Sequence, residues 1–234
     1  MTEITSPHNE ALKEVRKLAG RRWRDKLGSF VAEGEDLLEA ADAAGWHAVA
    51  RYAASGSDLP GIPVAPHVLA TVSQLGSGTR ALAVYPQKWS APVGPRCVAL
   101  WGVNDPGNVG TVIRSALAFG ASSVALGPGS ADPYGHKAVR ASMGALFSVP
   151  VARVRSVDEL PGRKIALVAR GGEPLAPIDG EVTLLVGAER EGLPDEVVAA
   201  CDAVAHIPIA HADSLNAAMA ATVALYEISR ISRS

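Results

Sequence analysis

Short apolar runs alternate with apolar residues at helical spacing through the second half of the chain. Short, mostly apolar runs predict strands, whereas apolar residues three and four positions apart predict helices. By this criterion the strands lie at 97–101, 123–126, 149–154, 164–169, 182–186 and 203–208, and the helices at 109–119, 136–147, 195–200 and 215–230. Strands that alternate with helices form a mostly parallel sheet with helices on both faces. The pattern therefore predicts an α/β fold.

The beginning of the chain has its own, smaller pattern of apolar positions. It predicts helices at 30–44 and 66–75 and strands at 47–53 and 80–85. After these elements, Pro86, Pro92, Gly94 and Pro95 interrupt the periodic pattern, as residues of a linker do. We therefore expect two domains, a small N-terminal α/β domain at residues 1–90 and a larger C-terminal domain at residues 95–234.

The composition is that of a globular protein with a sizeable core, because 48% of the 234 residues are hydrophobic. No apolar run reaches the roughly 18 to 20 residues that span a bilayer, and residues 1–14 are polar, unlike a signal peptide. We therefore expect a cytoplasmic protein with no membrane association. Cys97 and Cys201 lie far apart in apolar sequence and are predicted to be buried free thiols. Neither they nor the scattered histidines have the close spacing of metal ligands, so no metal site is expected.

Positive charge is concentrated near the N-terminus, although the formal net charge is only −2. Between residues 13 and 26, only Glu14 and Asp25 oppose it. The basic side chains there are Lys13, Arg16, Lys17, Arg21, Arg22, Arg24 and Lys26. The first three follow the i, i+3, i+4 spacing that places side chains on one face of a helix, where they could bind the phosphates of a nucleic acid. The alternative is an ordinary solvated helix.

Three polar loops, each after an apolar run, carry most of the chemically useful side chains. They cover residues 104–114, 187–194 and 207–216. In α/β proteins ligands bind where loops leave the carboxyl ends of strands, so we expect these loops to form one pocket. The Gly-x-Gly-x-x-Gly motif of dinucleotide-binding proteins and the Walker phosphate-binding motif are both absent. Nicotinamide and nucleoside triphosphate chemistry therefore lose support.

The three loops resemble, in order and spacing, the motifs of the SpoU or TrmH family of RNA ribose methyltransferases, a branch of the knotted SPOUT class. The matching positions are Asn108, Gly110, Arg114 and Ala116 in the first loop, Gly187, Glu189 and Gly192 in the second, and Ile207, Pro208, Ser214, Leu215 and Asn216 in the third. The resemblance covers residues 95–234. One departure lies in the third loop, where four residues, 210–213, stand in place of an expected five that include a glycine. We therefore expect this loop to have a different shape.

Two further segments resemble parts of family members that act on ribosomal RNA. The segment 137–147, which contains Arg140, is similar to a stretch that many of these members carry. The segment that begins at Phe30 resembles the small ribosomal-protein-like domain with which many members bind substrate. The resemblance therefore implies RNA as the partner, with ribosomal RNA favoured over transfer RNA. It adds Arg140 to the predicted RNA contacts, which are Lys13, Arg16, Lys17, Arg21, Arg22 and Arg24.

The resemblance implies S-adenosylmethionine as the methyl donor, bound beside a deep trefoil knot at the C-terminus. By analogy, Gly187, Ile207 and Leu215, together with Ala169, hold this cofactor through backbone groups and apolar contacts. The side chains of Ile207 and Leu215 are equally well explained as core. Family members form homodimers, and the small alanine side chains of the last predicted helix would allow a second subunit to pack closely. They would equally allow packing within one subunit.

The reaction implied is attack of a ribose 2′-hydroxyl on the donor's methyl group, and the resemblance assigns its catalysis to Arg114, Asn108, Glu189, Ser214 and Asn216. Because arginine is protonated at neutral pH, two accounts stay open. Arg114 clamps an RNA phosphate that takes the proton, which we favour, or a crowded site makes the guanidinium itself basic. Asn108 is expected to orient the ribose or Arg114, and Glu189 to pair with either residue. Ser214 and Asn216 would position substrate or the donor's carboxylate, although Asn108 and Ser214 are also good helix caps.

Three rival functions are compatible with the same fold. A non-catalytic protein that binds RNA or assists ribosome assembly would be expected to lack several of the five catalytic side chains, yet all five are present. An enzyme of this family could act on transfer RNA instead. It could also be a resistance methylase that modifies an antibiotic site of ribosomal RNA. The sequence does not identify the nucleotide that is methylated.

Overall fold

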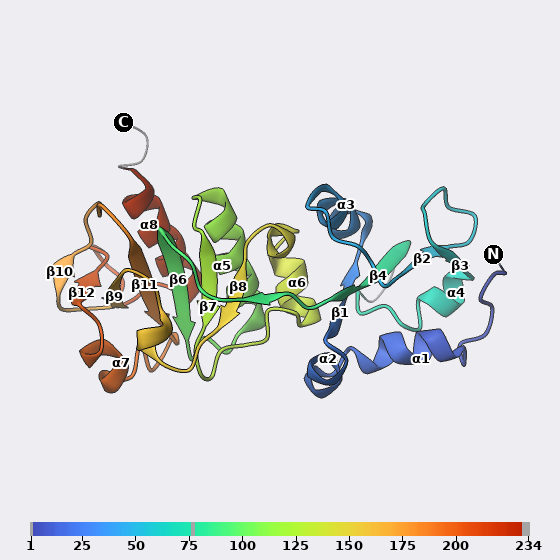
Figure 1. Cartoon of the computed structure of the whole chain (residues 1–234), viewed down its shortest axis with the longest axis horizontal. Helices are drawn as coiled ribbons and strands as arrows, with labels where there is room; N and C mark the ends of the chain where they lie inside the picture. Colours follow the sequence, from blue (N-terminus) through green and yellow to red (C-terminus); the bar gives the residue numbers. More distant parts are fainter. Residues whose placement is uncertain (1, 76–77, 231–234) are drawn as a thin grey trace.

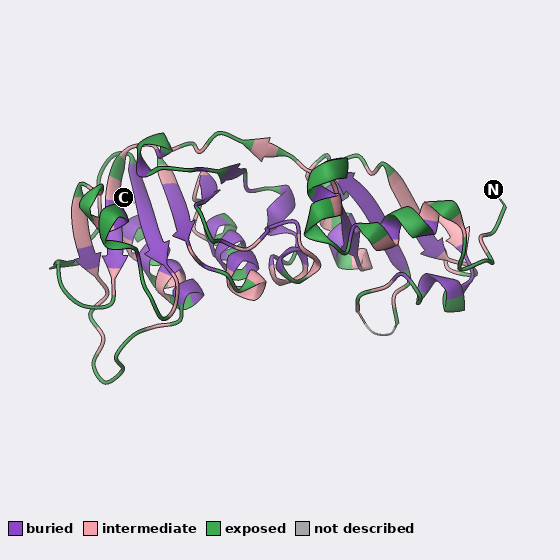
Figure 2. Ribbon diagram, turned by 90° about the horizontal axis from the view of Figure 1, so that it is seen from below, coloured by how far each residue is buried: buried purple, intermediate pink, exposed green. Residues whose placement is uncertain are grey.

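The structure is a computed structural model that describes residues 2–75 and 78–230, and it has two lobes arranged along one axis (Figure 1). The N-terminal lobe contains a four-stranded sheet and the C-terminal lobe an eight-stranded sheet. Buried strands run through the middle of each lobe, and the exposed residues lie mainly on helices and loops around them (Figure 2). Each lobe therefore has its own layer of sheet and helix.

The N-terminal lobe packs helices on both faces of its sheet. Its strands are β1 (Ser29–Glu33), β2 (Ala50–Ala54), β3 (Ile62–Val64) and β4 (Ala81–Pro86), and its helices are α1 (Glu10–Lys17), α2 (Arg21–Leu27), α3 (Glu35–Ala43) and α4 (Pro66–Leu69). In the order β1-β4-β2-β3, β4 is antiparallel to both neighbours, and β2 is parallel to β3. Side chains alternate along β4: Leu82 and Val84 pack with Leu12 of α1, whereas Ala83 and Tyr85 face the other lobe's core.

The C-terminal lobe confirms the predicted α/β class with a mostly parallel sheet. Its strands are β5 (Trp89–Ser90), β6 (Arg96–Trp101), β7 (Ser123–Leu126), β8 (Val151–Arg153), β9 (Arg163–Val168), β10 (Glu173–Pro174), β11 (Val182–Gly187) and β12 (Ala203–His206). They lie in the order β10-β12-β9-β11-β6-β7-β8-β5, and each pair of neighbours is parallel. Its helices are α5 (Pro106–Ala118), α6 (His136–Ala141), α7 (Asp195–Ala199) and α8 (Ala217–Ser229), with 3₁₀ turns at Ala145–Phe147 and Val157–Glu159.

Helices cover both faces of this sheet, as expected for parallel strands. Alternate residues of β6 point to opposite faces: Val98 and Leu100 pack in the cluster that contains the buried side chains of α5 and α8. Cys97 and Ala99 pack in a second cluster with Val197 of α7. Because the central strands are buried on both sides, most exposed chemical groups of this sheet lie on the loops and at the strand ends.

One hydrophobic core continues from the N-terminal lobe into the C-terminal lobe. The rings of Phe30, Trp46 and Tyr85 lie within 5.2–6.1 Å of the Phe147 ring, and the Trp46 indole N–H donates to the Phe147 carbonyl at 2.8 Å. The strand β5, which ends at Ser90, pairs with β8 of the larger sheet. The lobes are therefore packed together through aromatic side chains and are not merely joined by a linker.

Two buried carboxylates also connect the lobes. The Arg24 guanidinium of α2 lies 2.8 Å from the carboxylate of Asp132, which follows β7, and both side chains are less than a tenth exposed. Glu33 at the end of β1 accepts hydrogen bonds from the hydroxyls of Ser73 and Thr79 and lies 3.6 Å from the His136 imidazole. Burial lowers the pKa of His136 below its usual range, with Glu33 opposing this shift and Arg140 adding to it.

Several predicted elements were wrong in their bounds or type. The predicted helix at 30–44 is strand β1 followed by helix α3, because residues 29–33 pair with β4. The predicted helix at 136–147 ends at Ala141, because Met143 and Gly144 have φ values of 49° and 86° that do not belong to an α-helix. The predicted helix at 66–75 shortens to Pro66–Leu69. The predicted helix at 109–119 begins three residues earlier, at Pro106, and ends at Ala118.

The two cysteines are free thiols. Cys97 is buried and free, whereas Cys201 is free but only half-buried, which corrects the prediction that both are buried. Burial raises the pKa of both thiols, that of Cys201 to about 11.

Among residues 2–75 and 78–230, no helix has the length and apolar content needed to cross a membrane, and no three His, Cys, Asp or Glu residues are grouped as metal ligands.

Candidate active site

The three predicted loops lie together at one edge of the C-terminal sheet. The first follows β6, the second follows β11 and the third follows β12. Since β12, β9, β11 and β6 are consecutive parallel neighbours, their carboxyl ends share that edge. The three loops therefore share one edge of the sheet, although the cavity at this edge is lined by the second and third loops and not by the first.

Hydrogen bonds join one side chain from each loop. The Asn108 side-chain amide donates to a carboxylate oxygen of Glu189, and the Asn216 side-chain amide donates to Asn108 Oδ1 at 3.2 Å. These partners lie 81 and 108 positions apart in the sequence. We call Asn108, Glu189 and Asn216 the amide–carboxylate network. Glu189 was expected to pair with Asn108 or Arg114, and in the structure its partner is Asn108.

Two side chains, one of them a member of the network, cap the helices at the site. The Asp105 carboxylate accepts from the Asn108 backbone N–H at 2.9 Å and caps α5. Asn216 Oδ1 accepts from the backbone N–H groups of Ala218 and Met219 and caps α8. The capping roles considered for Asn108 and Ser214 therefore belong to Asp105 and Asn216. The Asn108 side chain is left for the network.

Arg114 lies on α5 but does not take part in the network. It is exposed, and among the described residues it has neither a hydrogen bond nor an ion pair. Arg114 lies six positions after Asn108, about one and two-thirds turns along the helix. The two side chains therefore leave α5 on different faces. The guanidinium is therefore free to meet an anion outside this chain's own site.

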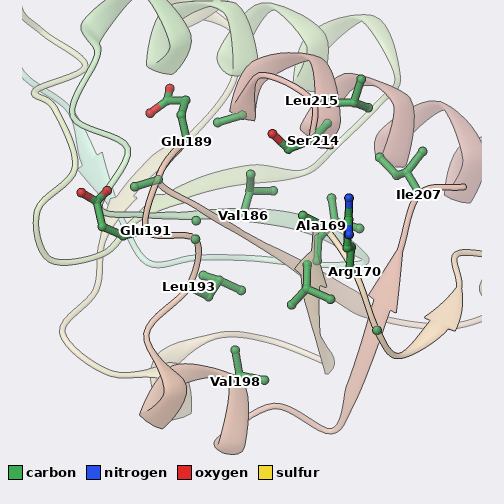
Figure 3. Close-up of a pocket in the computed structure, with 18 of the residues that line it drawn as sticks. Ala169, Arg170, Val186, Glu189, Glu191, Leu193, Val198, Ile207, Ser214 and Leu215 are labelled. Carbon is green, nitrogen blue, oxygen red and sulfur yellow. The ribbon is translucent and has the colours of Figure 1, made fainter. Parts of the chain in front are cut away.

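A cavity of about 580 Å³ opens beside the network, at the ends of β9, β11 and β12 (Figure 3). It is lined by all four residues predicted to hold a cofactor, Ala169, Gly187, Ile207 and Leu215. Its size falls in the range of about 300–1,000 Å³ that is typical of small-molecule sites. The cavity therefore has room for a ligand of cofactor size next to polar side chains.

The lining is apolar in its interior with polar groups at a few positions. Val186, Leu193 and Val198 contribute apolar surface, and Glu189 and Ser214 contribute polar groups (Figure 3). An apolar wall suits a flat heterocycle, and isolated polar groups fix its orientation. The cavity thus shares Glu189 with the network.

Gly187 is required where the second loop folds back on its own strand. A Cβ at this position would overlap the Gly192 carbonyl carbon and the Leu193 backbone nitrogen. The loop is closed there by backbone hydrogen bonds of 3.2 and 2.9 Å between Ala188 and Gly192. Only glycine permits this close approach, so the identity of residue 187 sets the shape of the cavity wall.

The shortened third loop is attached to the loop after β9. The Arg170 guanidinium forms an ion pair with Asp213, and the His206 ring lies 3.1 Å from the Gly171 carbonyl. Residues 210–213 are all exposed. Residues 210–213 therefore lie at the surface, where Arg170 pairs with Asp213.

Most of the predicted RNA contacts are exposed on α1 and α2. Lys13 is ion-paired with Glu10 at 2.6 Å, and Arg16 donates to the Thr71 hydroxyl at 2.7 Å. Lys17 and Lys26 lie over the ring of Trp23, 5.2 and 5.0 Å from its centroid. Both arginines at the start of α2, Arg21 and Arg22, are exposed. The basic stretch is therefore a surface, with one exception.

That exception is Arg24, whose prediction as an RNA contact was wrong. The residue is 6% exposed, and besides Asp132 its guanidinium donates to the carbonyls of Leu18 and Ala19 at 2.8 Å each. Its hydrogen-bonding groups are used inside the protein. Arg140 is also engaged, because its guanidinium lies 3.2 Å from the Asp36 carboxylate of the other lobe, yet it stays partly exposed.

The sequence interpretation missed part of the cavity wall. Arg170, Gly172 and Val204 line the cavity, and none of them belongs to the three motifs. The available signal was the end of the predicted strand at 164–169, since residues that follow a parallel strand lie at the ligand-binding edge. From that strand, only Ala169 was predicted to line the site.

Comparison with known proteins identifies similar chains over the whole length. Residues 95–226 match the profile described as the SpoU rRNA Methylase family. A solved structure described as an AdoMet-bound rRNA methyltransferase from Sinorhizobium meliloti is 32% identical, covers 100% of this chain and 99% of its own, and superposes with a TM-score of 0.88. The similarity therefore includes both lobes.

Two curated relatives have assigned RNA targets. The 23S rRNA (guanosine(2553)-2′-O)-methyltransferase RlmP of Bacillus subtilis is 29% identical over 97% of this chain and 99% of its own length. The 23S rRNA (uridine(2479)-2′-O)-methyltransferase of Streptomyces viridochromogenes is 41% identical over 53% of this chain. This chain spans about half of that second relative, 49% of its length. The two relatives differ in the nucleotide that they modify.

Proposed function

Because the chain belongs to the SpoU rRNA methylase family, we propose that it transfers a methyl group from S-adenosylmethionine to a ribose 2′-hydroxyl of ribosomal RNA. The observation that carries this proposal is the amide–carboxylate network beside the cavity of about 580 Å³. The network offers groups for a hydroxyl, and the cavity offers space for a methyl donor. We place the reaction in the cytoplasm, where ribosomal RNA is found.

The residues of the cavity fit S-adenosylmethionine. Ile207, Leu215 and Val186 provide apolar contacts for an adenine, and the closed loop at Gly187 exposes backbone to the ligand. Ser214 and the ion-paired Arg170 lie where a carboxylate could bind. When bound, S-adenosylmethionine supplies an electrophilic methyl group with a neutral thioether as its leaving group. We propose that the chain is knotted behind this cavity, as the family resemblance implies.

The network residues have roles that follow from their hydrogen bonds. The carboxylate of Glu189 fixes the amide of Asn108, and Asn216 holds the opposite side of the same amide. Asn108 is thereby oriented to hydrogen-bond the ribose, which aligns the 2′-hydroxyl with the methyl group. Arg114 clamps the adjacent RNA phosphate through its planar guanidinium, and the phosphate accepts the hydroxyl proton.

We propose a homodimer in which α5 and α8 face the second copy. Leu117, Met219, Val223 and Tyr226 are large hydrophobic side chains on these two helices, and between 42% and 63% of their surface is exposed. Exposed apolar patches on packed helices are typical of protein interfaces. Arg114 lies on the same helix as Leu117, so it could serve the cavity of the partner. A monomer mass in sedimentation equilibrium would contradict this arrangement.

The basic surface of α1 and α2 is proposed to bind RNA electrostatically. Replacing both Arg21 and Arg22 with Ala should weaken RNA binding and lower the slope of log K against log salt by about 0.9 for each phosphate that is no longer neutralised. The slope is measured by filter binding of ribosomal RNA between low and moderate salt. Arg163→Ala, which removes an exposed arginine at the opposite edge of the sheet, should leave it nearly unchanged. An unchanged slope in the double variant would make this surface an ordinary solvated one.

The Gly187→Ala variant tests the proposed cofactor cavity. The added methyl group meets the backbone of Gly192 and Leu193, so the second loop must move and the cavity changes shape. We expect the affinity for S-adenosylmethionine in calorimetry to fall about tenfold or more. Gly20→Ala is the matched control, because its φ of −89° suits any residue and a Cβ there meets only ordinary contacts at 3.6 and 3.8 Å. Equal affinities of both variants would argue against this position for the cofactor.

The function itself is tested with total RNA from a strain that lacks the protein. Incubation with S-adenosylmethionine carrying a labelled methyl group should label the large ribosomal RNA, and alkaline hydrolysis should leave the label in a dinucleotide that resists cleavage at the modified ribose. Label in transfer RNA would replace the proposed substrate. No label in any RNA would favour a protein that binds RNA without methylating it.

A further inference from the structure

A second cavity, of about 330 Å³, lies at the same edge of the C-terminal sheet as the first. It is formed at the ends of β7 and β8, by the loop that follows Leu126 and by residues 153–155. Trp89 of β5 and Arg21 of the N-terminal lobe complete its wall. The cavity therefore combines an aromatic ring with three arginines from two segments, Arg21 of α2 and Arg153 and Arg155 at the end of β8.

The aromatic part of the wall is firmly positioned. The Trp89 ring packs at 5.0 Å from the Tyr134 ring in an edge arrangement, and its N–H donates to Gln87 Oε1 at 3.1 Å. The guanidinium carbon of Arg153 lies over this ring at 4.0 Å from its centroid. The Arg153 side chain is 47% exposed, so part of the guanidinium is open to solvent. A guanidinium backed by an indole is a platform on which an RNA base can stack.

The charges around the cavity favour an anion. The Asp25 carboxylate forms ion pairs with two guanidinium groups, that of Arg153 at 2.7 Å and that of Arg21 at 3.7 Å. Asp132 is neutralised by Arg24. Arg155 is exposed, and among the described residues its guanidinium has no ion pair, whereas its backbone N–H donates to Glu159 at 2.7 Å. Positive charge therefore exceeds negative charge here, and Arg155 is available to a phosphate.

The cavity lies next to the strand that leads to the amide–carboxylate network. The Gly102 backbone N–H, just beyond β6, donates to the Pro128 carbonyl in the cavity wall at 3.0 Å. The β6 strand is followed by the loop that carries Asn108, and β8 lies two strand spacings away, about 10 Å. A strand of RNA with its ribose at Asn108 could therefore place a neighbouring nucleotide in this second cavity.

We propose that the second cavity binds an unpaired nucleotide that flanks the methylated one, with its base on Arg153 and its phosphate on Arg155 and Arg21. The identification of the ligand as RNA rests on the proposed function. Sequence-specific RNA recognition commonly uses unstacked bases held on aromatic or guanidinium planes. The cavity would hold the strand in register, while the network and the first cavity carry out the chemistry.

The test compares the binding of a fluorescent single-stranded hexauridylate to matched variants. Arg155→Ala should raise its dissociation constant about tenfold, the loss of one charged hydrogen bond. Arg163→Ala removes the same charge at the opposite edge of the sheet and should change it less than about twofold. Arg153→Lys keeps the charge beside Asp25 but removes the stacking plane, and should weaken binding about fivefold or more with an unaltered melting temperature.

The same variants separate this inference from the proposed function. In the methylation assay, Arg155→Ala should raise KM for RNA with kcat nearly unchanged, as expected when binding is lost equally in the ground and transition states. If no RNA is methylated but Arg155→Ala still weakens hexauridylate binding, the proposed function fails and the nucleotide site stands. No binding of hexauridylate to the wild type, or equal weakening by Arg155→Ala and Arg163→Ala, overturns the nucleotide site.

Discussion

Arg114→Ala is expected to lower kcat/KM for methyl transfer by at least about a hundredfold while it leaves the affinity for S-adenosylmethionine nearly unchanged. The ribose hydroxyl is a poor nucleophile until its proton has an acceptor, and Arg114 is the side chain proposed to hold that acceptor. Affinity for the donor should persist because Arg114 does not line the first cavity. Single-turnover kinetics with ribosomal RNA and calorimetry with S-adenosylmethionine measure the two quantities separately.

Arg114→Lys distinguishes the two accounts of the proton transfer. A lysine keeps the positive charge but lacks the planar fork that binds a phosphate through two hydrogen bonds. If the phosphate is the base, the lysine variant should retain low activity, and its rate of methyl transfer should not rise steeply at alkaline pH. A lysine that loses its own proton would cause such a rise in rate. Such a rise would favour a side chain that acts as the base. Wild-type rates in Arg114→Ala would remove the residue from the mechanism altogether.

The position of the site could be predicted because it depends on the order of the strands. Alternating strands and helices imply a parallel sheet, and the carboxyl ends of parallel neighbours meet at one edge. Loops separated by 81 and 108 positions are thus brought together by topology alone. The motif residues Asn108, Glu189 and Asn216 then meet because each stands just beyond the end of a strand or at the start of a helix on that edge.

What could not be predicted depends on partners that are distant in sequence and do not repeat. Residues 29–33 form a strand because they pair with residues 82–86, although their apolar spacing also suits a helix. The contacts between the two lobes also join residues that are distant in sequence. Arg140 could be read only as a basic residue of a motif, since its partner Asp36 lies 104 positions away on another lobe.

Arg24 is the clearest case, and its burial leads to the second large effect. Arg24→Ala should lower the free energy of unfolding by about 3–5 kcal/mol, because it leaves the Asp132 carboxylate buried without its partner. The hydrogen bonds that hold this pair come from the guanidinium, which donates to Asp132, Leu18 and Ala19, and from the Tyr134 backbone N–H, which donates to Asp132. Urea unfolding followed by circular dichroism measures the decrease.

The double variant Arg24→Met with Asp132→Leu supplies the control. With both charges removed, no unpaired charge is left buried. The double variant should therefore unfold with a free energy closer to that of the wild type than to that of Arg24→Ala. Because Asp132 is part of the wall of the second cavity, the single variant should also weaken RNA binding without any contact between Arg24 and phosphate. A change in unfolding free energy below about 1 kcal/mol in Arg24→Ala, as for an exposed pair, would contradict the buried position of this arginine and return it to the basic surface.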